Sequence, residues 1–185
     1  EASKPDTHLT ILLNFADGAV TEELLFETGL GFSALCCQDS LLFGGDANSD
    51  SVMVFNLSDS GVDPVMVFDI GGRAKQLYVH PRGTDSYDLT AISSDGARSV
   101  NINVKDRSTN FLWQTPSRFL VNNSYYDEGS LVLSSETGDI DSYWLVYGYP
   151  QPVLSGSAVV SVSPRSLLMI GLDLLVVGSE SGVSL

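Results

Sequence analysis

A short pattern that recurs about every 42 residues limits the fold of this chain more than any other feature of its sequence. In each copy an apolar stretch runs into a turn of small and polar residues, and another apolar stretch follows. Three of the turns hold a glycine, at Gly96, Gly138 and Gly182, and 42 and 44 residues separate these glycines. Because glycine readily takes the positive φ that tight hairpins need, each copy predicts a β-hairpin. The period indicates a series of similar units that stack on one another.

A second pattern, a β-like stretch that ends near proline or asparagine, marks the first strand of each unit. It occurs at Pro81 and again at Pro164, 83 residues further on, and Asn123 lies midway, 42 residues after Pro81. We therefore expect four inner strands, at residues 32–37, 74–82, 119–123 and 158–165. Second strands are expected at 40–45, 88–96, 130–138 and 173–182, and fourth strands at 64–69, 110–114 and 151–154. The third strands carry a bulky residue at matching places, namely Phe55, Ile102 and Trp144.

These units predict an all-β fold, because runs of helix formers at a 3.6-residue period are scarce. We predict β-propeller blades of four antiparallel strands that form a partial ring, with about four blades in residues 31–185 and the last one incomplete. Residues 8–15 and 20–26 flank an Asp-Gly turn, so we expect residues 1–30 to be the outer strands of a preceding blade. Both ends are expected to be cut from a longer chain, and other residues or another chain would complete the ring.

The turns resemble those of the WD-repeat family. Blades of that family have a turn similar to Ser-x-Asp-Gly and then a strand that ends in an aromatic residue followed by Asp or Asn. The best match here runs from Ser94 to Asn103, and the resemblance covers about residues 31–185, although the Gly-His pair of the family is absent. The resemblance implies a rigid platform that binds other proteins.

Charge and composition argue against several functions. Nine basic and 23 acidic residues give a net charge of −14, which repels a phosphate backbone, so we expect no nucleic-acid partner. No stretch approaches the roughly 18 uninterrupted apolar residues of a membrane span. Cys36 and Cys37 are adjacent, so they do not form spaced zinc ligands, and we expect free thiols in a reducing, intracellular compartment such as the cytoplasm or nucleus.

No constellation of residues predicts an enzyme, a cofactor or a metal site. The two histidines, His8 and His80, have no nucleophile motif beside them. Asp139 and Asp141 lie two positions apart on a strand, but nothing else indicates the cleft of a glycosidase. Residues 46–50 alternate oxygen-bearing side chains as calcium loops do, but they lack the glycine and the closing glutamate of such a loop, which favours an ordinary turn.

Acidic residues recur in or beside the turns between second and third strands. In a propeller these turns and the connections between blades lie on one face, so we expect these acids to form an acidic rim, opposed mainly by Arg73 and Arg118. The simpler hypothesis is that each acid only stabilises its own turn. The alternative is a docking face for a basic segment of a partner protein. The candidate residues are Asp46, Asp50, Asp95, Glu136, Asp139 and Glu180.

The sequence thus favours a non-catalytic β-propeller scaffold that mediates protein–protein assembly in a larger intracellular complex with other subunits. Two alternatives stay open. One is a virion or phage tail structural protein, suggested by the low content of lysine and arginine. The other is a secreted calcium-binding or hydrolytic propeller, for which glycans at Asn56 or Asn122 would be the sign.

Overall fold

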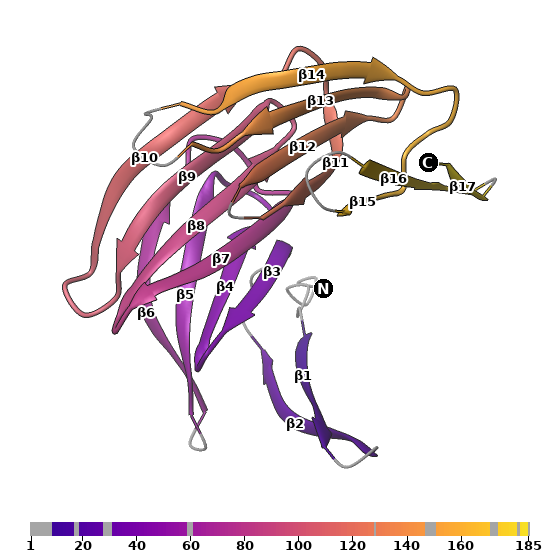
Figure 1. Ribbon diagram of the computed structural model, residues 1–185. Coiled ribbons are helices and arrows are strands. Elements are labelled where there is room, and N and C mark those ends of the chain that lie inside the picture. Colours follow the sequence, from indigo (N-terminus) through magenta and orange to yellow (C-terminus); the bar gives the residue numbers. More distant parts are fainter. Residues whose placement is uncertain are drawn as a thin grey trace, which may run out of the picture.

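The computed structural model describes residues 9–16, 19–27, 31–58, 61–127, 129–146, 151–170, 174–180 and 182–184. All described elements are strands (Figure 1). The N-terminal hairpin contains β1 (Leu9–Ala16) and β2 (Ala19–Glu27). Sheet I contains β3 (Phe32–Gln38), β4 (Leu41–Asp46), β5 (Ser51–Ser58) and β6 (Gly61–Asp69). Sheet II contains β7 (Gln76–Gly83), β8 (Ser86–Ser93), β9 (Gly96–Asn103) and β10 (Ser108–Pro116). Sheet III contains β11 (Val121–Tyr126), β12 (Ser130–Ser135), β13 (Asp139–Trp144) and β14 (Val153–Val159). Sheet IV contains β15 (Ser166–Ile170), β16 (Leu174–Ser179) and β17 (Gly182–Ser184).

Each sheet is an antiparallel meander in which neighbours in sequence are neighbours in space. Sheets I, II and III have four strands each, sheet IV has three and the hairpin has two. The predicted class is confirmed: the chain is all-β, and its four-stranded sheets follow one another as blades do (Figure 1). Among the described strands no closed ring is seen, and sheets I to IV follow one another in an open arc (Figure 1).

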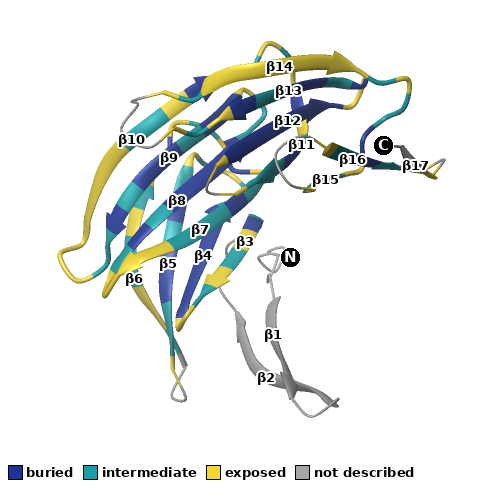
Figure 2. Cartoon of the chain, viewed as in Figure 1, coloured by how far each residue is buried: buried dark blue, intermediate teal, exposed yellow. Residues whose placement is uncertain are grey.

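The sheets stack because both of their faces are apolar. Phe43 and Val54 of sheet I pack with Leu89 and Ile102 of sheet II, and all four side chains are fully buried. A second cluster joins sheets II and III, and a third joins sheets III and IV. Full burial of one such side chain stabilises the fold by about 1.5–3 kcal/mol. Burial therefore runs along the middle of each sheet, from one sheet to the next (Figure 2).

Side chains of the inner strands add polar links between neighbouring sheets. The Ser33 hydroxyl donates to the carbonyl of Ala74 at 2.6 Å, and the Tyr78 hydroxyl donates to the carbonyl of Ser124 at 3.1 Å. The Asn123 amide donates to the carbonyl of Pro164 at 3.3 Å. These bonds satisfy carbonyl groups that strand pairing leaves open, and they fix how far one inner strand is shifted along the next.

In each sheet the turn between the second and third strands lies at the same end of the arc as the connections between sheets. The amide of Ile70, in the connection from β6 to β7, donates to the carbonyl of Asp50, in the turn from β4 to β5. Equivalent bonds run from Ser117 to Asp95 and from Val160 to Gly138. Because backbone atoms make these contacts, each turn is fixed against the next connection. We call this end the turn face; it comprises the described residues 46–50, 70–75, 94–96, 117–120, 136–139, 160–165 and 178–180.

The predicted inner strand at 158–165 is wrong. Residues 153–159 form the outer strand β14, residues 160–165 connect the sheets, and the inner strand β15 begins at Ser166. Pro81 lies inside β7 near its end, whereas Pro164 lies in the connection before β15, so the two prolines are not equivalent. Proline is tolerated at both places because neither needs its N–H for a central ladder.

The expected equivalence of Trp144 and Ile102 is also wrong. Ile102 is fully buried, whereas 57% of Trp144 is exposed. The turn before β13 is one residue longer than the turn before β9. Trp144, which pairs with Ser130, is therefore equivalent to Asn101, which pairs with Asp88, and not to Ile102. A shift of one residue moves a strand's side chains to the opposite face. The expected glycines do adopt positive φ, 143° at Gly96 and 98° at Gly138.

Replacement of Gly138 should test the contact between the turns and the connections. A Cβ atom at this position would lie 2.1 Å from the carbonyl oxygen of Val160, and the backbone φ is unfavourable for other residues. We expect Gly138→Ala to lower the free energy of unfolding by about 1–3 kcal/mol, measured by urea denaturation. Gly156→Ala is the matched control, since a Cβ there meets nothing within 4 Å. Equal effects of the two substitutions would contradict this account.

Candidate binding face at the turn end of the sheets

All six acidic residues predicted from the sequence lie at the turn face. Asp46 ends β4 and Asp50 directly precedes β5, whereas Asp139 begins β13. Asp95 and Glu136 lie in the turns of sheets II and III, and Glu180 follows β16. The meander brings these residues to one end of the arc, each on its own sheet. They differ, however, in what their carboxylates bind.

Two of the six carboxylates stabilise their own turns. Asp46 accepts hydrogen bonds from the amide of Asn48 at 2.9 Å and from the hydroxyl of Ser49 at 2.7 Å, and these bonds lower its pKa. Asp139 accepts from the hydroxyls of Thr137 at 2.7 Å and Ser135 at 2.9 Å, which lower its pKa in the same way. For these two residues the simpler hypothesis of a turn role accounts for the side chain.

The other four carboxylates reach outward. Glu180 forms an ion pair with Arg165 at 2.9 Å, with both side chains largely exposed. Asp50, Asp95 and Glu136 are exposed, and their carboxylates contact no other described residue through a hydrogen bond or an ion pair. The backbone carbonyls of Asp50 and Asp95, in contrast, accept hydrogen bonds from the next connection, and in the turn of Glu136 the carbonyl of Gly138 does so. These three residues therefore present unpaired negative charge from fixed positions.

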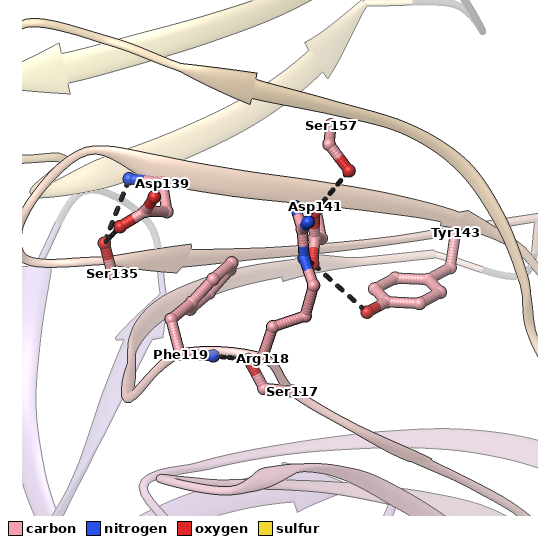
Figure 3. Close-up of polar contacts among 8 residues, drawn as sticks. All are labelled: Ser117, Arg118, Phe119, Ser135, Asp139, Asp141, Tyr143 and Ser157. Carbon is pink, nitrogen blue, oxygen red and sulfur yellow. Dashed lines mark hydrogen bonds and ion pairs between the residues drawn. The ribbon is translucent and has the colours of Figure 1, made fainter.

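A buried polar cluster beside this face is not predicted as a site by the sequence. Asp141 of β13 is completely buried and accepts from the Arg118 Nε at 2.8 Å, from the Ser157 hydroxyl at 2.6 Å and, more weakly, from the Tyr143 hydroxyl at 3.5 Å (Figure 3). A second guanidinium nitrogen of Arg118 completes a bidentate pair. The cluster binds the connection at 117–120 to the third and fourth strands of sheet III.

The electrostatics of this cluster favour an ionised Asp141. Burial raises the pKa of the carboxyl group, but the hydrogen bonds from Arg118 and Ser157 and the Arg118 charge outweigh burial, so the pKa lies below its usual value. The same contacts raise the pKa of Arg118, whose side chain is 61% exposed. A strand that is buried on both faces rarely holds a carboxylate without a partner. The sequence signal for this cluster is therefore the acid Asp141, which lies between the apolar Ile140 and the aromatic Tyr143.

The turn face is less uniformly acidic than the sequence predicted. Each connection between sheets carries one arginine, Arg73, Arg118 or Arg165. Acids also lie in or beside the turns at the opposite end of the arc, which we call the opposite face. Its described acidic residues are Asp39, Asp63, Asp85, Asp106 and Asp127. Acidity alone therefore does not distinguish the two ends.

The described residues contain no group of three or more His, Cys, Asp or Glu side chains arranged to hold a metal ion. The calcium-like stretch at 46–50 is a turn in which Asp46 binds Asn48 and Ser49. None of the elements in the described part of the chain is a helix with the length and apolar character of a membrane span.

Comparison with known proteins supports the fold and gives no family. No protein-family model matches the chain, and no curated protein matches it. Among solved structures, the chain is similar to the crystal structure of the computationally designed Ika4 protein, with 11% sequence identity and a TM-score of 0.59. The similarity covers 84% of this chain and 89% of that one. At this level of identity it shows a shared fold alone.

Substitution of Asp141 should reveal the buried ion pair as a pH-dependent contribution to stability. Because folding lowers the pKa of Asp141, its contribution is complete above the unfolded value of about 4 and is lost as the pH falls through the folded value. We expect Asp141→Asn to lower the free energy of unfolding by about 1.5–3 kcal/mol at pH 7. The difference from the unsubstituted protein should shrink below about pH 4.

Urea unfolding at several pH values measures this difference. Asp95→Asn is the control, because the Asp95 carboxylate is exposed and contacts no other described residue. A difference for Asp141→Asn that stayed constant between neutral and acidic pH would show that the charge of Asp141 does not stabilise the fold.

Proposed function

We propose that this chain is a non-catalytic scaffold of the β-propeller type, related to WD-repeat proteins, that binds a basic segment of another protein within a larger assembly. The observation that carries the proposal is the set of exposed carboxylates of Asp50, Asp95 and Glu136, which have no partner among the described residues. They stand on three successive sheets, in turns whose backbones are hydrogen-bonded to the next connection. A charged surface held in one geometry binds with little loss of conformational entropy.

The relation to WD repeats rests on the turn at Ser94-Asp95-Gly96. This turn joins the second and third strands of a four-stranded antiparallel sheet, as the family pattern requires. The free thiols of Cys36 and Cys37 are consistent with action in the cytoplasm or nucleus, where disulfides are rare.

Three further features favour protein binding over catalysis. The ion pair of Arg118 and Asp141 holds a connection against sheet III. The carboxylates of Asp46 and Asp139 are used by their own turns. The groups left over are single carboxylates on separate sheets, which suits several lysine or arginine side chains of an extended segment and offers no acid–base pair.

Charge reversal at the turn face should weaken binding of a basic peptide. The probe is a synthetic lysine-rich peptide with a fluorescent label, titrated with the protein at low salt. We expect the double variant Asp95→Lys/Glu136→Lys to bind about tenfold more weakly, since each exposed ion pair is worth up to about 1 kcal/mol. Added salt should weaken binding to the unsubstituted protein, because screening acts on exposed charges.

The matched control is Asp63→Lys/Asp106→Lys, which makes the same change in net charge at the opposite face, where both side chains are also exposed. The proposal expects this control to bind the peptide nearly as well as the unsubstituted protein. If both double variants lost affinity equally, the peptide would be responding only to the net charge of −14 and the turn face would not be a docking site.

A further inference from the structure

Sheet IV leaves an apolar face uncovered. Leu167 and Met169 of β15 pack toward sheet III, so the alternate residues Leu168 and Ile170 lie on the outward face, where 52% and 53% of their surfaces are exposed. Ile170 pairs with Leu174 of β16, which shares this face and is 41% exposed. Figure 2 shows the exposure of β15.

The corresponding faces of the other sheets are covered. On sheet I, Leu41 and Phe43 of β4 face sheet II and are 6% and 0% exposed. On sheet III, Val132 of β12 faces sheet IV and is fully buried. The outward face of sheet IV is therefore apolar like the faces that form the three interfaces between sheets within the chain. Such a face is typical of a sheet that packs on another sheet.

Sheet I has a matching gap on its other side, at its inner strand. Ala34 and Cys36 of β3 pack toward sheet II, so Leu35 and Cys37 face away from it, and Leu35 is 47% exposed. Cys37 pairs with Leu42 of β4 and shares its face, yet Leu42 is only 1% exposed. On this face of sheet I, Leu42 of β4 is therefore buried, whereas Leu35 and Cys37 of the inner strand β3 are exposed.

We propose that two copies of the chain associate head to tail, with β15 and β16 of one copy packed over the exposed part of β3 of the second. One contact then covers both faces: Leu168, Ile170 and Leu174 of one copy lie against Leu35 and Cys37 of the other. The contact continues the stack of sheets that already exists within each copy. Two such contacts close a ring of two arcs, and the interface is heterologous, because each copy contributes a different surface.

The charge distribution fits this occupant. None of β3, β15 and β16 contains a charged residue, although the chain carries a net charge of −14. The contact itself is therefore free of repulsion, whereas the two copies repel each other at long range. Salt strengthens this association, which is opposite to its effect on the binding of a basic peptide at the turn face. The inference concerns the faces of the sheets and is independent of the proposed docking at the turns.

Self-association of the purified chain tests the proposal. Sedimentation and native mass spectrometry over protein concentrations of about 1–100 μM should show a dimer that is favoured by added salt. Leu35→Glu and Leu168→Glu should each raise the dissociation constant about tenfold or more, because each places a charge in an apolar contact. Both side chains are about half exposed, so the folded copy should tolerate either change; circular dichroism and urea unfolding check this.

Mixing the two variants gives the sharper result. A Leu35→Glu copy retains an intact sheet IV and a Leu168→Glu copy retains an intact β3. An equimolar mixture should therefore form a heterodimer through one intact contact, whereas neither variant alone has an intact contact. Val159→Glu is the control, since Val159 is 77% exposed on the outer strand β14 of sheet III, which takes no part in the proposed contact. It should leave dimerisation unchanged.

Three outcomes would overturn the proposal. One is a chain that stays monomeric at high concentration and high salt, as it would if other residues or the same chain covered these faces. Another is a dimer that neither glutamate variant weakens. The third is a dimer that both variants weaken but that mixing does not restore, which would indicate a symmetric contact through one surface.

Discussion

The burial of both faces of each sheet is the constraint on which the rest of this structure depends. A β-sheet that is apolar on one face needs one partner, whereas sheets II and III are apolar on both faces and need two. Leu89 and Ile92, three residues apart on β8, pack in different clusters on opposite sides of sheet II. The chain meets this need by repeating one sheet in series, so that each sheet packs on the next.

Stacking also decides where polar groups can lie. Side chains between the sheets are mostly apolar or hydrogen-bonded, because burial of an unpaired polar or charged group is costly. Most charged residues therefore lie in the turns and connections. The backbone bonds from Ser117 to Asp95 and from Val160 to Gly138 then bring each turn against the next connection. The exposed turns and connections of the turn face are therefore held at fixed positions. A docking surface requires this property, because a fixed surface loses little conformational entropy on binding.

The sequence predicted the units well and their boundaries less well, for physical reasons. Gly96 and Gly138 revealed the hairpins because positive φ leaves glycine almost without competitors at those positions. Proline carries no comparable information about the start of a strand, since it is tolerated wherever its missing N–H is not needed. The pattern at Pro164 was therefore read as a strand although the residue lies in a connection. Trp144 was misplaced because one extra residue in a turn reverses every side chain that follows it.

The candidate site was predicted to the same partial extent. Turn chemistry places Asp46, Asp95 and Glu136 at one end from sequence alone, because meander topology leaves no other arrangement. Whether a carboxylate is used or free depends on hydroxyls and guanidinium groups that approach in three dimensions. Ser157 and Arg118 lie 16 and 23 residues from Asp141, and no short-range pattern links them.

Arg98 and Asp141 show how similar sheets are kept distinct. Arg98 pairs with Ala91 and Asp141 pairs with Leu133, so the two residues hold the same place in sheets II and III but carry opposite charges. Arg98 lies over the ring of Phe111, 5.4 Å from its centre, whereas Asp141 takes the guanidinium of Arg118. If the connection at 117–120 docked on sheet II, Arg118 would meet a like charge and Asp141 would be buried without its partner. Both consequences are costly, so this position helps to ensure that each connection packs on its own sheet.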